Sequence, residues 1–336
     1  MQKFIYGTGV FFAVLIIVGL ALPRHARIDV STHIDAPPAT VFALVNDYHR
    51  FALWSPLIDT DPNARVVYSG PTRGVGATMT WDGTIIGTGT QTITASRPFE
   101  YVETVVSPGE PAEARFWFDI RGEGDGTTIT WSFETDFAYN LVGRYLALAV
   151  AGVIRRDYEH GLENLKELAE TLPMADFGDL EIEQIVVEPV IIAYLPTASI
   201  PQSAAISQAM GDAYFEILSF IDRHGLAEAG APISIMRSFN GSEMRFDAAI
   251  PVRGVSDSAP QTGKKVRLGQ TYSGSVIRVR HIGPYRDLGD THRKISAYLA
   301  ALDLERAGDA WESYVSDPTK VAESELLTYV YYPIRP

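Results

Sequence analysis

Hydrophobic and polar residues alternate in several short stretches after Ala26, and the first of them, RIDVSTHI, predicts a β-strand. The stretch APPATVFALVND predicts a helix that begins at its prolines, and YHRFALWSP predicts a second helical turn that ends at Pro56. Further β-rich stretches separated by Gly, Pro or Asp turns predict an antiparallel meander. From Tyr139 to about Leu172 no proline interrupts the chain and apolar residues recur at helical spacing, so we expect one long helix.

This order of elements resembles the START-like helix-grip family, also called the polyketide cyclase-like or SRPBCC superfamily. The residues that carry the resemblance are IDAPPATVFALVNDYHRFALWSP, and it covers residues 27–172. It implies an antiparallel sheet held by a long C-terminal helix, with an apolar ligand between the two. The middle of that helix carries the small residues Ala147, Ala149, Ala151 and Gly152. They would leave volume for the ligand, although a close helix–sheet contact would explain them equally.

A linker with proline and glycine, residues 173–178, precedes an internal repeat over residues 179–336. Each copy predicts a strand, a helix and two further strands, and the helices are expected from about Ser203 to His224 and from about Asp287 to Leu302. Each copy ends in a strand interrupted by a proline, Pro251 or Pro333. The expected class is therefore α+β, with a helix-grip sheet followed by a duplicated βαββ domain.

The second copy carries the motifs HIGPY, WESYVSDP and LLTYVYYPI, which resemble the GyrI-like, or AraC effector-binding, family. The resemblance implies two halves that face each other across a cleft for small organic molecules. It also implies that a glutamate at the position of Glu312 contacts those molecules. Some members act as drug-sensing domains of transcription factors, and others resemble hydrolases of strained electrophilic compounds. The chain has no helix-turn-helix pattern beside this domain, so a role in transcription is not expected.

The stretch FIYGTGVFFAVLIIVGLAL, from Phe4 to Leu22, carries no charge. At about 1.5 Å per residue it is just long enough to span a hydrocarbon core of about 30 Å. We therefore expect residues 1–26 to form a single-pass transmembrane anchor, with the globular part outside the cytoplasm. A cleaved signal peptide is the alternative, but Pro23 and Arg24 stand where its cleavage site would be.

The composition excludes several classes of partner and cofactor. The net charge is −13, from 41 acidic and 28 basic residues, and no basic run is long enough to follow a phosphate backbone, so we expect no nucleic acid. The absence of cysteine excludes disulfides, thiolate nucleophiles and cysteine-ligated metals. No G-x-S-x-G is present, and the glycines of GTGTQT are not followed by a helix, so we expect no cofactor. The histidines show no paired ligand spacing, and we expect no metal at any of them: His25, His33, His49, His160, His224, His281 and His292.

In AWESYVSDP, alternation places Glu312 and Tyr314 on one face of a strand and Trp311 on the other. In the last strand, Tyr329 and Tyr331 share a face. Superposing the two copies puts Ser234 opposite Glu312. A carboxylate among aromatic rings accepts cationic or amine-bearing ligands through charge pairing and cation–π contact, whereas a solvated strand face is the plainer reading. The candidate ligand-binding residues are Glu312, Trp311, Tyr314, Tyr329 and Tyr331.

From these features we expect a membrane-anchored protein that binds or sequesters hydrophobic or cationic small molecules in the GyrI-like cleft. The START-like cavity is a second candidate site for such a ligand. One alternative is a hydrolase of electrophilic small molecules in which Glu312 acts as general base. Another is lipid binding or transfer by the first domain. Whether the protein is an enzyme stays open at this point.

Overall fold

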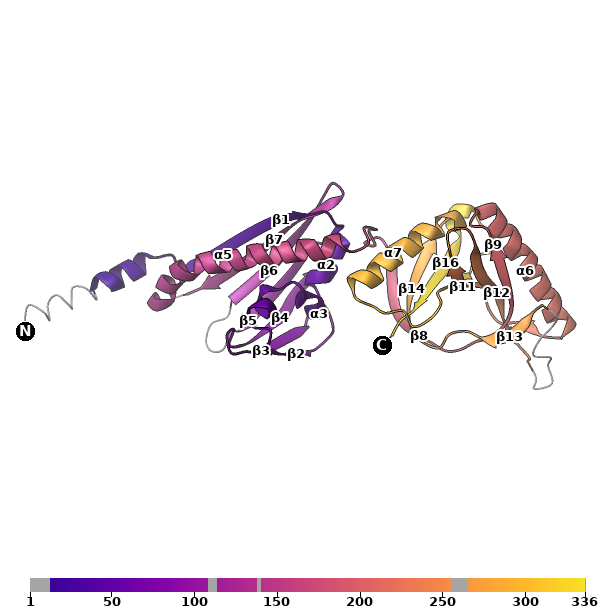
Figure 1. The fold of residues 1–336 in the computed structure, drawn as a ribbon, viewed down its shortest axis with the longest axis horizontal. Helices are drawn as coiled ribbons and strands as arrows, with labels where there is room; N and C mark the ends of the chain where they lie inside the picture. The colour runs from indigo at the N-terminus through magenta and orange to yellow at the C-terminus, as the bar shows by residue number, and fades with distance from the viewer. Residues whose placement is uncertain (1–12, 108–113, 138–139, 256–264, 336) are drawn as a thin grey trace, which may run out of the picture. The chain divides into compact units, whose positions relative to one another are not determined.

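The computed structural model describes residues 13–107, 114–137, 140–255 and 265–335, and Figure 1 shows the course of the chain. The chain divides into two compact units, Met1–Gly178 with Ala300–Leu302 and Asp179–Leu299 with Asp303–Pro336. Each unit contains its own antiparallel sheet together with helices, so the predicted α+β class is confirmed.

The sheet of the first unit has the strand order β1-β7-β6-β5-β4-β3-β2, and all neighbouring strands are antiparallel. Strands β2 to β7 form a meander, and β1 pairs with β7 along its whole length, from His25 opposite Asp136 to Ile34 opposite Thr127. The strands are β1 His25–Ile34, β2 Arg65–Ser69, β3 Thr78–Asp82, β4 Thr88–Arg97, β5 Tyr101–Ser107, β6 Ala114–Glu123 and β7 Gly126–Asp136.

The helices of this unit begin where local signals in the sequence place them. They are α2 Pro38–Val45, α3 Tyr48–Phe51, α4 Pro56–Thr60 and α5 Leu141–Glu170. Prolines open α2 and α4, because the N–H that proline lacks has no intrahelical partner in the first turn. The side chains of Asp47, Ser55 and Asn140 accept backbone N–H groups at the starts of α3, α4 and α5.

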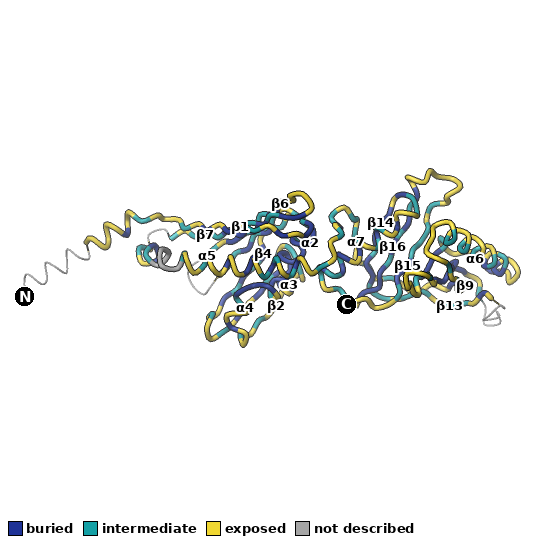
Figure 2. Tube along the Cα trace, turned by 45° about the horizontal axis from the view of Figure 1, so that its top comes forward, coloured by how far each residue is buried: buried dark blue, intermediate teal, exposed yellow. Residues whose placement is uncertain are grey.

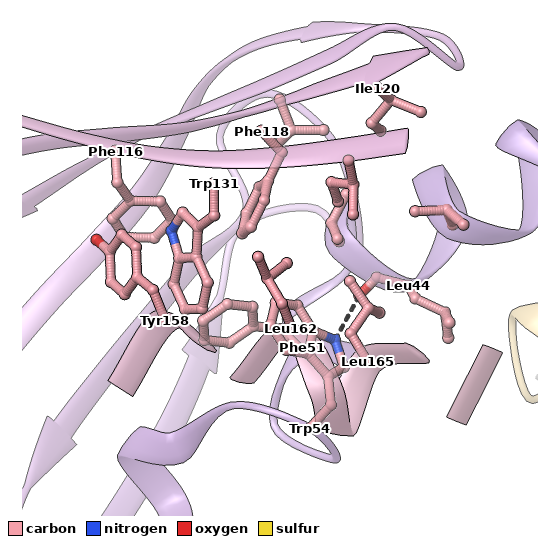
Figure 3. Packing of buried hydrophobic residues seen from close by; sticks show 14 of the residues in the cluster. Leu44, Phe51, Trp54, Phe116, Phe118, Ile120, Trp131, Tyr158, Leu162 and Leu165 are labelled. Carbon is pink, nitrogen blue, oxygen red and sulfur yellow. Dashed lines mark hydrogen bonds between the residues drawn. The ribbon is translucent and has the colours of Figure 1, made fainter. Parts of the chain in front are cut away.

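Helix α5 covers the sheet, and an aromatic core packs between them (Figure 3). The rings of Trp131 and Tyr158 stack with centroids 3.8 Å apart, and the buried Trp54 indole donates to the Leu44 carbonyl at 3.2 Å. The helix lies close to the sheet at Gly161, where a Cβ atom would lie 2.8 Å from the Trp131 ring and 2.9 Å from Pro56. Any side chain at this position would push α5 away from the sheet.

The predicted membrane anchor is wrong. Within the described residues, no helix is long and apolar enough to cross a membrane. The first part of the predicted span, residues 4–12, lies outside the described residues. The described remainder is helical only over residues 13–21, which at about 1.5 Å per residue covers roughly half of a hydrocarbon core.

This short helical segment is held by the start of α5. The Arg144 guanidinium donates to the carbonyls of Gly19, Leu20 and Leu22 at 3.2, 3.2 and 3.1 Å, and the Tyr145 hydroxyl donates to the Leu15 carbonyl at 2.6 Å. Carbonyls at the C-terminal end of a helix lack intrahelical partners, so Arg144 acts as their cap. The apolar stretch thus ends against a buried cation of the first unit.

The second unit has a nine-stranded sheet with the order β13-β9-β12-β11-β15-β16-β14-β8, and β10 lies beside β12. Its first half is the run β9-α6-β11-β12 and its second half is the run β14-α7-β15-β16, so β11 and β15 meet at the centre. The strands are β8 Glu181–Val187, β9 Ile191–Ser199, β10 Ala227–Glu228, β11 Ile233–Phe239, β12 Met244–Arg253, β13 Arg267–Gln270, β14 Gly274–Ile282, β15 Trp311–Tyr314 and β16 Leu327–Pro333.

The helices of the second unit are α6 Ser203–Arg223 and α7 Leu288–Ala301, with short 3-10 turns η1 Tyr285–Asp287 and η2 Glu323–Glu325. Helix α6 packs on Ala248 and Ile250 of β12, and α7 packs on Val330 and Tyr332 of β16. A row of paired residues crosses the sheet from β12 to β16. Its register pairs are Ala248–Ser234, Ser234–Glu312 and Glu312–Val330. Because paired residues share a face, α6 and α7 cover the same face of the sheet. Figure 2 shows buried strands and an exposed outer side of α6.

Candidate functional site

Glu312 lies at the centre of the helix-covered face of the second sheet. Its side chain is 13% exposed, and its register partners are Ser234 on β11 and Val330 on β16. The Tyr314 hydroxyl donates to Glu312 Oε2, so these two residues share a face, as alternation along the strand predicts. Glu312 is therefore a partly buried carboxylate and not a freely solvated strand residue.

His292 of α7 reaches the other carboxylate oxygen. Its Nε2 lies 2.7 Å from Glu312 Oε1, and its Nδ1 lies 2.8 Å from the Tyr332 hydroxyl. The His292 side chain is 21% exposed, whereas Tyr332 is buried. Both oxygens of Glu312 and both nitrogens of His292 thus have a partner, which fixes the orientation of the carboxylate.

Aromatic and soft side chains surround this pair. The Tyr285 and Tyr314 rings meet edge to face with centroids 5.2 Å apart, and the Met210 sulfur of α6 lies 4.0 Å from the Tyr314 hydroxyl. Tyr214 of α6 donates its hydroxyl to the Ile233 carbonyl at 3.0 Å. The arrangement offers one carboxylate together with polarisable surfaces, which suits an apolar cation.

The tyrosines around Glu312 are held in their neutral form. Burial, with a smaller contribution from the charge of Glu312, raises the pKa of Tyr314 and of Tyr214 well above the ordinary tyrosine value. Burial also raises the pKa of Tyr285 and Tyr332. These hydroxyls therefore keep their protons near neutral pH and can act as hydrogen-bond donors.

The other predicted site residues lie on the opposite face of the sheet. Trp311 stacks on Tyr331 with centroids 4.7 Å apart and planes at 6°, and the Tyr329 and Tyr331 centroids are 6.3 Å apart. The Arg278 guanidinium lies 5.0 Å from the Tyr329 ring centroid and also donates to Glu183. The structure thus brings Glu312 and Tyr314 together, but it separates them from Trp311, Tyr329 and Tyr331.

The predicted site residues do not include several side chains around Glu312: Met210, Tyr214, Tyr285, His292 and Tyr332. The spacing of the histidines carries no signal for His292, because its helix-to-strand contact is not local in the chain. The repeat does contain a signal, because Tyr214 precedes Ser234 by 20 residues, as His292 precedes Glu312. Within the described part of the chain, no three histidine, aspartate or glutamate side chains gather as a metal site would require.

The first unit contains a cavity of about 510 Å³ between the sheet and the helices. Ala151 and Ile154 of α5 contribute to it, whereas Gly152 is exposed and a Cβ atom there would meet no atom within 4 Å. The expected cavity-lining role therefore fits Ala151 and is wrong for Gly152; the side chains of Ala147 and Ala149 lie outside the described ones. The aromatic lining residues are Phe51, Trp81, Phe116, Trp131, Phe133, Phe137 and Tyr158.

Polar atoms around this cavity are sparse. The indole nitrogens of Trp81 and Trp131 are buried without a hydrogen-bond partner among the described residues. The amide of Gln91, also buried, lies 3.9 Å from the Met79 sulfur, which is a weak acceptor. The cavity is thus suited to a mainly apolar molecule.

The glycine motif GTGTQT has a structural explanation. Gly89 of β4 is the register partner of Trp81 on β3, and a Cβ atom on Gly89 would lie 2.2 Å from the Trp81 ring. The indole therefore lies across the glycine, and the motif from Thr88 onward is part of a strand.

Comparison with known families gives a match for each unit. Residues 25–170 match the family described as Polyketide cyclase / dehydrase and lipid transport. Residues 181–335 match the family described as GyrI-like small molecule binding domain. The chain carries a polyketide cyclase-like domain followed by a GyrI-like domain. This order confirms both resemblances drawn from the sequence.

Solved structures show weaker similarity. The EcmrR C-terminal domain is 12% identical, with a TM-score of 0.39, over 47% of this chain and 98% of that one. The protein CV1439 from Chromobacterium violaceum is 15% identical, with a TM-score of 0.31, over 43% and 96%. A hydrolase from Listeria innocua is 12% identical, with a TM-score of 0.33, over 46% and 91%. The search of curated proteins gave no match.

Proposed function

We propose that the protein binds hydrophobic molecules that carry a positive charge or an amine, and that Glu312 of the GyrI-like domain is their polar anchor. The observation that carries this proposal is a partly buried carboxylate set among aromatic side chains on the helix-covered face. Charge pairing and cation–π contact would act together there. The GyrI-like small molecule binding family supports the same class of function.

In the described part of the chain, no permanent cation neutralises the carboxylate of Glu312. Among the described residues, its ion-pair partner is His292, which is charged only when protonated. No ion pair joins Glu312 to a described lysine or arginine, and the nearby cation Arg278 lies on the opposite face beside Glu183. A cationic ligand therefore need not displace a permanent positive charge.

The decisive experiment compares Glu312→Gln with the wild-type chain. Titration calorimetry would measure the affinity for tetraphenylphosphonium, an apolar cation, and for triphenylphosphine oxide, a neutral molecule of similar shape. We expect Glu312→Gln to weaken cation binding by about 1–3 kcal/mol, the Coulomb attraction between a carboxylate and a bulky cation in a partly buried site, with little effect on the neutral probe. Glu183→Gln is the matched control, because it removes a carboxylate from the other face.

Two results would contradict the proposal. If Glu312→Gln and Glu183→Gln change cation affinity equally, the charge of Glu312 does not anchor the ligand. If binding of an electrophilic compound is unchanged in Glu312→Gln while its hydrolysis falls on the order of a hundredfold, Glu312 is a general base and the protein is a hydrolase.

A second candidate function is apolar ligand or lipid binding by the first domain, favoured by its cavity of about 510 Å³. Ala151→Phe would fill part of this space, whereas the neighbouring Gly152→Ala adds a methyl group that meets no atom within 4 Å. We expect the first variant to weaken binding of the neutral fluorescent probe N-phenyl-1-naphthylamine and the second to leave it unchanged. Equal probe binding by both variants would place the probe elsewhere.

A further inference from the structure

His292 connects the carboxylate of Glu312 to a buried hydroxyl. An ionised carboxylate can only accept hydrogen bonds, so His292 Nε2, 2.7 Å from Glu312 Oε1, is the donor. Nδ1, 2.8 Å from the Tyr332 oxygen, can accept the tyrosine O–H when the imidazole is neutral or donate to that oxygen when it is protonated. The imidazole therefore keeps two hydrogen bonds in either protonation state.

The imidazole proton changes the net charge of the pair. With His292 protonated, the ion pair with Glu312 is neutral overall, and with His292 neutral the pair carries one negative charge. Imidazole is the side chain that ordinarily exchanges its proton between pH 5 and 8. A cation placed at Glu312 would meet the neutral pair at low pH and the negative pair at high pH.

The other groups around the pair keep their charge in this pH range. Burial raises the pKa of the four tyrosines that face it from β15, β16, α6 and η1, namely Tyr314, Tyr332, Tyr214 and Tyr285. The Arg306 guanidinium lies 5.1 Å from the Tyr332 ring centroid and stays charged. The charge of Asp317 contributes to the raised pKa of Tyr285. Hydrogen bonds from Thr319 lower the pKa of Asp317 itself to about 2.

We propose that His292 sets the charge preference of the Glu312 site by exchanging its proton for a cationic ligand. The inference rests on the proposed function. When the cation binds, the Nδ1 proton of His292 passes to solvent, the Tyr332 hydroxyl turns to donate to Nδ1, and Nε2–H continues to donate to Glu312. One positive charge enters and one leaves, so the site stays neutral. His292 thus makes the site prefer cations at high pH and neutral apolar ligands at low pH.

The sign of the effect follows from this exchange. Because protonated His292 competes with the cation, affinity for a permanent cation rises with pH as the imidazole loses its proton. Exchange of one proton gives a slope of at most about tenfold in affinity per pH unit. Affinity for a neutral probe does not rise in this way.

The test uses the full chain and tetraphenylphosphonium, whose charge does not change with pH. Calorimetry between pH 5.5 and 8 in buffers of different ionisation enthalpy measures both affinity and the number of protons released. We expect proton release and rising affinity in the wild type. We expect neither in His292→Gln, which can still donate to Glu312 but cannot titrate.

The outcomes separate this inference from the proposed function. If wild-type binding depends on Glu312 but releases no proton, the role of His292 is wrong while the function stands. A pH slope that persists in a folded His292→Gln variant has the same meaning, and the wild-type proton count decides the question if that variant does not fold. If wild-type and Glu312→Gln chains bind tetraphenylphosphonium equally, both proposals fail.

Discussion

The two halves of the GyrI-like domain share one backbone plan but differ where they meet. Ser234 and Glu312 are register partners at the centre of the sheet. Tyr214 precedes Ser234 by the same number of residues as His292 precedes Glu312. The first half therefore has a serine and a tyrosine at the positions where the second half has a carboxylate and an imidazole in contact, and its tyrosine donates to the Ile233 carbonyl.

The largest loss of stability is expected when the first half is given the charge of the second. Ser234→Glu would place a carboxylate at a position that is 5% exposed, opposite Glu312 and beside a tyrosine. We expect a loss of about 3–5 kcal/mol in the free energy of unfolding, as for a buried charge without a partner. Denaturant titration measures it.

The additional change Tyr214→His supplies the missing partner and should recover part of this stability. A double variant no more stable than Ser234→Glu alone would show that the equivalence of the two halves does not extend to their side-chain contacts.

The reverse exchange makes the second half resemble the first. Glu312→Ser combined with His292→Tyr should lose about 1–3 kcal/mol of affinity for tetraphenylphosphonium, because the negative charge that attracts the cation is removed. Binding should also become independent of pH. Circular dichroism would check that the sheet is retained. Unchanged cation affinity in a folded double variant would show that the difference between the halves has no role in binding.

A third change separates the two faces of the sheet. Tyr331→Leu removes the stack on Trp311, with centroids 4.7 Å apart, and should lower the free energy of unfolding by about 0.5–1.5 kcal/mol through the loss of that stack. Tyr331→Phe keeps the ring and serves as the control. Neither variant should change the dissociation constant of tetraphenylphosphonium. A tenfold change in that constant would indicate that Tyr331 and the aromatic face take part in ligand binding.

The smallest effect is expected at Tyr214. Tyr214→Phe removes the hydrogen bond to the Ile233 carbonyl, which is 3.0 Å long. It should lower stability by about 0.5–1 kcal/mol, the net contribution of one neutral hydrogen bond. The pH dependence of cation binding should stay as in the wild type, because the titrating group lies in the other half. A changed pH slope would mean that Tyr214 takes part in the exchange.

Local patterns in the sequence predicted much of this fold. Proline entries and caps mark α2 and α4, and the strand alternation around Glu312 correctly placed Tyr314 on its face. The same alternation already separated Trp311 from Glu312, so grouping them as one site required a contact that a sheet does not allow.

What the sequence left open depends on packing between distant elements. The ring of His292 reaches Glu312 only because α7 lies over β15 and β16, and no local period reveals that contact. His281 of HIGPY also makes a contact between distant elements. It is buried, and its Nδ1 lies 2.9 Å from the Thr291 hydroxyl, so it connects β14 to α7 and has a structural role. The apolar N-terminal stretch suggested a membrane span because its residues are uncharged, whereas no described helix is long and apolar enough to cross a membrane.

The two edge strands of the second sheet affect how this domain can be made by the cell. Strand β8 precedes the first half but pairs with β14 of the second, and β13 precedes the second half but pairs with β9 of the first. A nascent chain that has emerged only as far as β12 therefore leaves β8 unpaired. Unpaired strands invite association with other chains, and such non-local pairings form slowly. During translation, the first half is expected to remain incompletely assembled and to depend on chaperones until the second half emerges.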